Sequence, residues 1–281
     1  MNETHSQPRV IDCDIAAALM EPLTDLVVQA GTAILAVDRK AMAVQGKLDG
    51  SPVTEADFAA DRIIGDGLAR LVPDVPALSE ERVHQARPPF RGSFFLIDPL
   101  DGTKEFVAGR GEFTVNLALV THGTPLLGIV SAPALGWLWR GLVGRGAERL
   151  RLNEAGKGPP EPIHTRPFPK SGAPWVAAVS RSHGDARTEA FVGSRPGAIR
   201  EKLGSAVKFG WIAEGKADIY PRLAPTSEWD VGAGHALVTA AGGTVTDEAG
   251  RPLRFGERAE SFIVPAFIAW GDPSAAVNPP H

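Results

Sequence analysis

One stretch, residues 94–106, constrains the fold and chemistry of this chain more than any other. It opens with four apolar residues, 94–97, which is typical of a short buried strand. Pro99 ends the strand pattern, because proline cannot donate a hydrogen bond to a neighbouring strand. Asp98 and Asp101 lie three residues apart at this point. We therefore expect a buried strand that delivers two carboxylates to one small volume.

The two carboxylates predict a site for a hard cation. Like charges this close raise each other's pKa unless a cation lies between them, and oxygen ligands suit magnesium. Gly102 and Thr103 follow with backbone N–H groups, and a helix that began there would favour an anion such as phosphate at its N-terminus. A metal beside an anion-binding turn indicates phosphate chemistry. The alternative is an ordinary strand–turn–helix connection, because Asp and Gly are common in turns.

Composition excludes several classes of protein. The 281 residues allow one large domain or two of moderate size. The formal net charge of -4 provides no basic field for nucleic acid. Cys13 is the only cysteine, which excludes an intrachain disulfide and a cysteine-based metal site. With no membrane-spanning run and no signal core, we expect a cytoplasmic enzyme; peripheral membrane association and the choice between monomer and homodimer stay open.

Apolar spacing divides the chain into two parts. In the first, we expect helices over residues 15–37, with Pro22 separating the early turns from the rest, and over residues 55–71. Strands are expected over residues 77–81, 113–120, 126–130, 137–143 and 148–152. The proline-rich residues 153–174 predict a linker. We therefore expect an N-terminal α+β domain over residues 1–155 and a C-terminal α/β domain over residues 156–281.

The second part alternates strands with helices. We expect strands over residues 175–179 and 217–220, and helices over residues 185–192, 205–215 and 231–241. Gly242 and Gly243 would end the last of these helices.

Two long motifs resemble signatures of the inositol monophosphatase superfamily. They are DPLDGT at residues 98–103 and WDVGAG at residues 229–234. Residues 104–106 (KEF) and 111–116 (GEFTVN) look most like its CysQ branch of 3'(2'),5'-bisphosphate nucleotidases. The resemblance covers about residues 23–270. It implies an α/β (α+β) fold, the five-layered α-β-α-β-α sandwich of the inositol monophosphatase/fructose-1,6-bisphosphatase type.

The resemblance also implies a set of metal ligands. They are Glu80, Asp98, the backbone carbonyl of Leu100, Asp101 and Asp230. Four carboxylates are too much charge for one magnesium ion but suit two or three, with waters completing each octahedron. Outside the resemblance, adjacent acids such as Glu80 and Glu81 are usually a solvated rim, and an Asp at a helix start such as Asp230 is usually an N-cap.

Catalytic roles follow from the same resemblance. Asp57 and Thr103 would orient the attacking water and take its proton, and Glu81 would help to orient it. The purely structural interpretation of Asp57 is a capping box with Thr54. The structural and the catalytic role are compatible. In the substrate pocket, the N–H groups of Gly102 and Thr103 would hold phosphate oxygens.

The second phosphate and the base of a nucleotide need further contacts. Lys208 and Arg222 would bind the phosphate that is not cleaved, and Tyr220 would border the adenine. His183 would contact the ribose or a phosphate, unless it is a surface histidine. Trp211 departs from the pattern, because a smaller residue is expected at that position, and it could reshape the pocket.

The predicted function is magnesium-dependent hydrolysis of the 3'(2')-phosphate of adenosine 3'(2'),5'-bisphosphate to AMP and phosphate. The partner would then be a small phosphorylated nucleotide, and the resemblance implies inhibition by lithium. Two alternatives stay open: an inositol-1-phosphate or sugar phosphatase of the same superfamily, and a catalytically inactive phosphonucleotide-binding protein.

Overall fold

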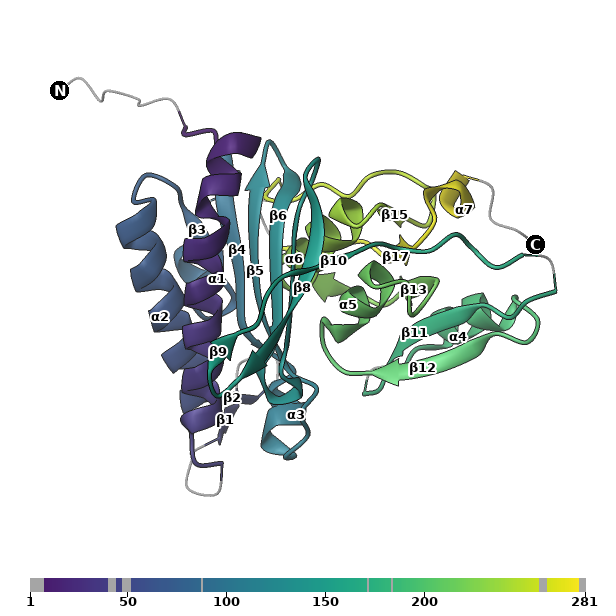
Figure 1. Cartoon of the computed structure of the whole chain (residues 1–281), viewed down its shortest axis with the longest axis horizontal. Helices are drawn as coiled ribbons and strands as arrows, with labels where there is room; N and C mark the ends of the chain where they lie inside the picture. The colour runs from purple at the N-terminus through teal and green to yellow at the C-terminus, as the bar shows by residue number, and fades with distance from the viewer. Residues whose placement is uncertain are drawn as a thin grey trace.

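The fold stacks helices and sheets in alternating layers (Figure 1). The computed structural model describes residues 8–39, 44–46, 52–86, 88–170, 172–182, 184–257 and 262–277. Its helices are α1 (Cys13–Ala36), α2 (Glu55–Leu71), α3 (Thr103–Val107), α4 (Ala186–Gly193), α5 (Val207–Ala213), α6 (Glu228–Ala240) and α7 (Pro273–Val277), with short 3-10 helices η1 (Glu80–Gln85) and η2 (Pro133–Leu135). Helices α1 and α2 cover the outer face of a large sheet, and α5 and α6 lie between this sheet and a smaller one. Helices α4 and α7 contact the smaller sheet, so the predicted five layers are present.

The large sheet carries most of the predicted strands. Its order is β10-β8-β7-β6-β5-β4-β3, with β9 paired to β8. The strands are β3 (Ala77–Ser79), β4 (Ser93–Asp101), β5 (Thr114–Thr121), β6 (Thr124–Ala132), β7 (Trp137–Leu142), β8 (Gly146–Asn153), β9 (Gly156–Lys157) and β10 (Glu161–Ile163). Alternate residues of β4 and β5 enter different cores: Phe95 and Leu117 pack with α1 and α2, whereas Leu96 and Ala118 pack with α5 and α6. This burial on both faces explains why the strands are apolar almost throughout.

Helix α1 corrects one prediction. Pro22 does not separate two helices, because α1 runs through it without a break. Ala16 on one side of Pro22 and Leu23, Val27 and Ile34 on the other are buried in the same core. Tertiary packing of this continuous apolar face outweighs the hydrogen bond that proline removes.

The smaller sheet has the order β12-β11-β13-β17-β15. Its strands are β11 (Val176–Ser180), β12 (Ile199–Leu203), β13 (Ile219–Arg222), β15 (Thr244–Asp247) and β17 (Phe267–Trp270), and two-stranded ribbons pair β1 (Val44–Gly46) with β2 (Pro52–Thr54) and β14 (Thr226–Ser227) with β16 (Ile263–Val264). Strand β12 was not predicted, because it is a largely exposed edge strand without an apolar pattern. The predicted linker contains β9 and β10, which still pair with the large sheet. The division into domains at residue 155 stays a prediction.

Helix α6 brings the second half of the chain onto the large sheet. It packs on β5 and β6, and a Cβ at Gly128 would come within 2.1 Å of the Ala233 carbonyl oxygen. Glycine at position 128 therefore lets the helix lie directly on the sheet. This contact places the N-terminal end of α6, with Asp230, near the end of β4. Among the helices of the described ranges, none has the length and apolar character needed to cross a bilayer.

Candidate active site

The site is built around the turn that leaves strand β4. Asp98 is almost completely buried, and its Oδ1 accepts a hydrogen bond from the Leu100 backbone N–H at 3.1 Å. Gly102 has a φ of +90°, a left-handed conformation that favours glycine. Thr103 then begins α3. The expected end of the strand at Pro99 is wrong, because β4 continues to Asp101. Its pairing with β5 shifts between Asp98 and Asp101, and proline is tolerated at such an irregularity. The turn and the helix start follow in the predicted order.

A hydrogen-bond network joins this turn to the start of α2. Asp57 completes the capping box with the N-cap Thr54, because its Oδ2 accepts from the backbone N–H and the hydroxyl of Thr54 at 2.8 and 2.7 Å. Its other oxygen, Oδ1, accepts from the Thr103 hydroxyl at 3.1 Å, and that hydroxyl also lies 3.2 Å from the Leu100 carbonyl oxygen. The capping role and contact with the active-site turn therefore belong to the same carboxylate.

Four acidic side chains share the volume beside the turn. Burial first, and then the charges of Glu80, Asp101 and Asp230, hold the pKa of Asp98 well above its usual range. Burial and the charge of Asp230 raise the pKa of Asp101 to about 7, although Lys208 opposes the shift. Buried acids that repel each other are unfavourable alone and need a compensating positive charge.

The donor set fits a hydrated hard cation. Within the described ranges, no three His, Cys, Asp or Glu side chains converge closely enough to form a cage of protein atoms alone. The donors that the turn does provide are carboxylate and carbonyl oxygens, which magnesium prefers, and magnesium usually keeps several of its waters. Asn116 lies opposite Asp98 in the β4–β5 ladder and is buried. Its carboxamide makes no close hydrogen bond, although it lies near enough to the Asp101 carboxylate to lower the pKa of that group. A buried carboxamide without a close partner, beside buried acids, is a second sign of a polar ligand.

Glu80 and Glu81 reach the site by a different route. Strand β3 runs parallel to β4, and both glutamates come directly after it, at the start of η1. Both are half-buried. The carboxyl ends of the two parallel strands thus lie side by side, which brings Glu80 within electrostatic range of Asp98.

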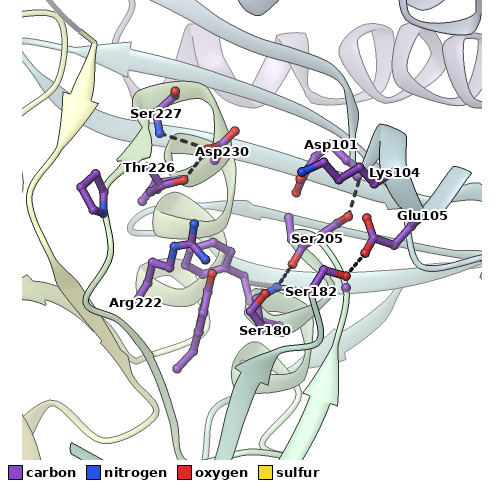
Figure 2. Close-up of a pocket in the computed structure, with 18 of the residues that line it drawn as sticks. Asp101, Lys104, Glu105, Ser180, Ser182, Ser205, Arg222, Thr226, Ser227 and Asp230 are labelled. Atoms are coloured by element: carbon purple, nitrogen blue, oxygen red, sulfur yellow. Dashed lines mark hydrogen bonds between the residues drawn. The ribbon is translucent and has the colours of Figure 1, made fainter. Parts of the chain in front are cut away.

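Two of these acids, Asp101 and Asp230, line a pocket of about 340 Å³ between the two halves of the chain, whereas Glu80 and Asp98 are not among its lining residues. Figure 2 shows Asp101 and Asp230 on either side of its upper part and Arg222 below them. Asp230 is not the N-cap of α6, because Ser227 holds that position. Its Oδ2 instead accepts from the Ser227 backbone N–H at 3.0 Å and from the Thr226 hydroxyl. These contacts with the two residues that precede α6 fix the orientation of the Asp230 carboxylate.

The predicted substrate residues differ in how they meet the pocket. Arg222 is half-buried and lines it. Lys208 is buried, and its Nζ donates to the backbone carbonyls of Leu203 and Ser205. Tyr220 also lines the pocket, but its ring packs edge-on against Phe209 and Phe267 in the core. His183 lies outside the described residues.

The chain is similar to known proteins over most of its length. Residues 16–273 match the model of the inositol monophosphatase family. The chain is 40% identical to the 3'(2'),5'-bisphosphate nucleotidase CysQ of Escherichia coli K12 over 258 residues, which cover 89% of this chain and 98% of that protein. The protein of the same name from Buchnera aphidicola is 35% identical over 255 residues, or 89% of this chain and 93% of that one.

The chain belongs to the inositol monophosphatase family. A crystal structure of CysQ from Bacteroides thetaiotaomicron, a bacterial member of this family, superimposes with a TM-score of 0.73 at 33% identity. The alignment covers 90% of this chain and 97% of that one. The predicted family and fold class are therefore confirmed.

Three polar residues at or beside the site were not predicted as site residues from the sequence. Asn116 sits in a strand pattern that looks purely structural. Glu105 is buried on α3 and accepts a hydrogen bond from Ser182 across the pocket (Figure 2). Ser205 donates from the second half of the chain to the Asp101 carbonyl. The KEF and GEFTVN motifs gave a sequence signal for Glu105 and Asn116, although not for their contacts, and the contacts of Ser205 are non-local.

Proposed function

We propose that this chain is a magnesium-dependent phosphatase that converts adenosine 3'(2'),5'-bisphosphate to AMP and phosphate. One observation carries the proposal: the DPLDGT turn and Asp230 meet at a pocket that Arg222 also lines. The pocket therefore combines a cluster of acids for cations with a separate cation for a second phosphate. The names of the CysQ relatives, at up to 40% identity over most of the chain, support the same substrate.

Two or three magnesium ions would be held by residues from both halves of the chain. The proposed ligands are Glu80, Asp98, the Leu100 carbonyl, Asp101 and Asp230. The chemistry supplied by bound magnesium is neutralisation of the phosphate charge and acidification of water. Asp98 and Asp101 would then be ionised by the charge of the ions, which reverses the effect of burial.

Thr103 and Asp57 would prepare the attacking water. The Thr103 hydroxyl donates to Asp57, so its oxygen has a lone pair free to accept from water. As the water oxygen forms a bond to phosphorus, its proton passes to Thr103, and the Thr103 proton passes to Asp57. Glu81 would help to orient this water. The bond between phosphorus and the ribose oxygen breaks, and that oxygen takes a proton from a second water molecule as AMP leaves. Asp57 then returns its proton to the solvent, which balances the step.

The turn and the smaller sheet would hold the substrate. The backbone N–H groups of Gly102 and Thr103 would hold the cleaved phosphate, at a turn where Gly102 is left-handed. Arg222 would bind the other phosphate, because a guanidinium makes strong charge-assisted contacts with phosphate. Lys208 would act mainly through its charge, since its Nζ already donates to backbone carbonyls. The role of Tyr220 beside the adenine and that of His183 stay predictions.

A substrate comparison tests the proposal. Steady-state rates are measured for adenosine 3',5'-bisphosphate, inositol-1-phosphate and fructose-1,6-bisphosphate, with and without magnesium. We expect the highest kcat/KM for the nucleotide and no turnover in EDTA. A preference for inositol-1-phosphate or fructose-1,6-bisphosphate would replace the nucleotide assignment, and tight nucleotide binding without turnover would indicate a binding protein. Lithium, titrated at fixed magnesium, should inhibit the active enzyme uncompetitively.

A further inference from the structure

Ser205 has an unusual backbone conformation. Among the described residues, His122 and Ser205 are the non-glycine residues with a positive φ, of 51° and 48°. His122 lies with Gly123 in the tight turn between β5 and β6, where left-handed residues are ordinary. Ser205 lies instead between β12 and α5, beside the pocket. A strained residue persists where its surroundings fix it, and such residues gather at functional sites.

The hydroxyl of Ser205 bridges two segments of the first half of the chain. Its Oγ lies 2.9 Å from the Asp101 carbonyl oxygen, the dashed contact in Figure 2, and 3.0 Å from the Glu112 carbonyl oxygen. A Cβ at Gly102 would lie only 2.2 Å from this Oγ. The hydroxyl thus packs directly on the turn that presents the N–H groups of Gly102 and Thr103.

A second set of contacts holds Ser205 in place. The Glu112 carboxylate accepts from the Gly204 backbone N–H at 2.8 Å and from two nitrogens of Arg181 at 2.9 and 2.8 Å. Lys208 donates to the Ser205 carbonyl from the other side. Residues 204–205 are therefore clamped between a loop of the first half and a helix of the second, which explains how the left-handed conformation is maintained.

We propose that Ser205 is a positioning residue for the phosphate-binding turn at Asp101–Thr103. Its hydroxyl fixes the Asp101 carbonyl, and through it the orientation of the Asp101 side chain and the Gly102 N–H. This inference rests on the proposed function, because it gives Ser205 a role in that reaction. A hydrogen bond to the turn matters for rate because a misplacement of about 1 Å at a reacting centre can cost about 100-fold.

Two substitutions separate the hydroxyl from the backbone strain. S205A removes the hydroxyl and keeps a Cβ in the left-handed conformation, whereas S205G removes both. We expect S205G to melt above S205A, because glycine adopts this conformation without steric cost. H122G is the matched control, because it relieves the same backbone conformation in the β5–β6 turn, which does not line the pocket.

If Ser205 positions the turn, both S205A and S205G lose about 10- to 100-fold in kcat with adenosine 3',5'-bisphosphate, with little change in KM. The magnesium concentration that gives half of the maximal rise in melting temperature increases in both, and H122G keeps the wild-type kcat, KM and magnesium midpoint. The magnesium midpoint is measured by melting and does not depend on turnover.

A merely structural role gives a different pattern. Activity then follows stability, S205G keeps wild-type kcat, and the magnesium midpoint is unchanged; this result overturns the proposal. If the wild type is active and both Ser205 variants keep its kcat and its magnesium midpoint, the role proposed for Ser205 is wrong and the proposed function stands. A wild type without turnover counts against the proposed function, and the magnesium midpoint still decides for or against Ser205. A wild type that does not respond to magnesium at all overturns both.

Discussion

Asp98 occupies a position that is unfavourable for folding and is explained by the proposed metal site. It is almost fully buried beside three other acids, which raise its pKa. We predict that Asp98→Asn lowers kcat at least about 1000-fold, because a lost ligand charge costs several kcal/mol at the transition state. Without metal, the same variant should melt at or above the wild-type temperature, since burial and the neighbouring acids oppose ionisation of Asp98 in the folded protein and Asn cannot ionise.

The control for Asp98→Asn is Asp66→Asn, an exposed position on the outer helix α2. It should change neither turnover nor melting temperature measurably. Near-normal turnover of Asp98→Asn in saturating magnesium would refute the assignment of Asp98 as a ligand. A large loss of stability would refute the argument from charge repulsion.

Arg222 tests the nucleotide assignment at a single side chain. Loss of a charge-assisted contact costs roughly 1.5–3 kcal/mol, so Arg222→Ala should lower kcat/KM for adenosine 3',5'-bisphosphate by about 10- to 100-fold. A monophosphate substrate lacks the second anion, and its turnover should change much less. Higher ionic strength should weaken the wild-type preference, because salt screens a partly exposed pair.

The comparison needs both substrates on one preparation of each variant. Arg200→Ala is the matched control, because Arg200 lies on β12 in the same half and pairs with Glu189. Equal losses for both substrates in Arg222→Ala would mean that Arg222 supports only the structure. That outcome would favour an inositol or sugar phosphatase.

At the scale of elements, the sequence predicted those whose signal is local. Strand β4, its turn and the β5–β6 hairpin carry dense apolar runs that end at proline or glycine. Strand β12 has no such pattern because it is an exposed edge. Ser205 could not be foreseen either, because its role depends on carbonyls about a hundred residues away. Local patterns therefore fix elements, and non-local contacts complete the site.

Helix α1 offers a test of how packing overrides propensity. Pro22 lies inside the helix and removes one backbone hydrogen bond. We predict that Pro22→Ala raises the free energy of unfolding by roughly 1–3 kcal/mol, measured by urea titration. Pro73→Ala, in the exposed turn after α2, should act in the opposite direction by about 0.4–1 kcal/mol, because it adds freedom to the unfolded chain. A lower stability of Pro22→Ala would show that the ring itself is needed for packing.

At the scale of the whole molecule, α6 joins the two sheets and carries a buried histidine. His235 lies on the face of α6 that meets Phe255, with ring centroids 5.6 Å apart. Its Nδ1 has no hydrogen-bond partner among the described residues. Burial lowers the pKa of His235 from 6.5 to about 4, so the histidine is neutral in the folded protein across most of the physiological range.

This neutral histidine predicts a pH-dependent stability. Below pH 6.5 the His235 side chain of the unfolded chain binds a proton, whereas that of the folded protein does not until about pH 4. The free energy of unfolding therefore decreases as the pH is lowered from 6.5 to 4. The loss approaches about 3 kcal/mol, since one pKa unit is worth about 1.4 kcal/mol. The buried acids of the active site titrate in the opposite direction, because folding raises their pKa. Wild type and His235→Gln share this contribution from the acids, so it cancels when their free energies of unfolding are subtracted. Urea titrations of both proteins at pH 7.5 and pH 5 should show wild type losing more stability than the variant, and parallel losses would mean that His235 is protonated in the folded state.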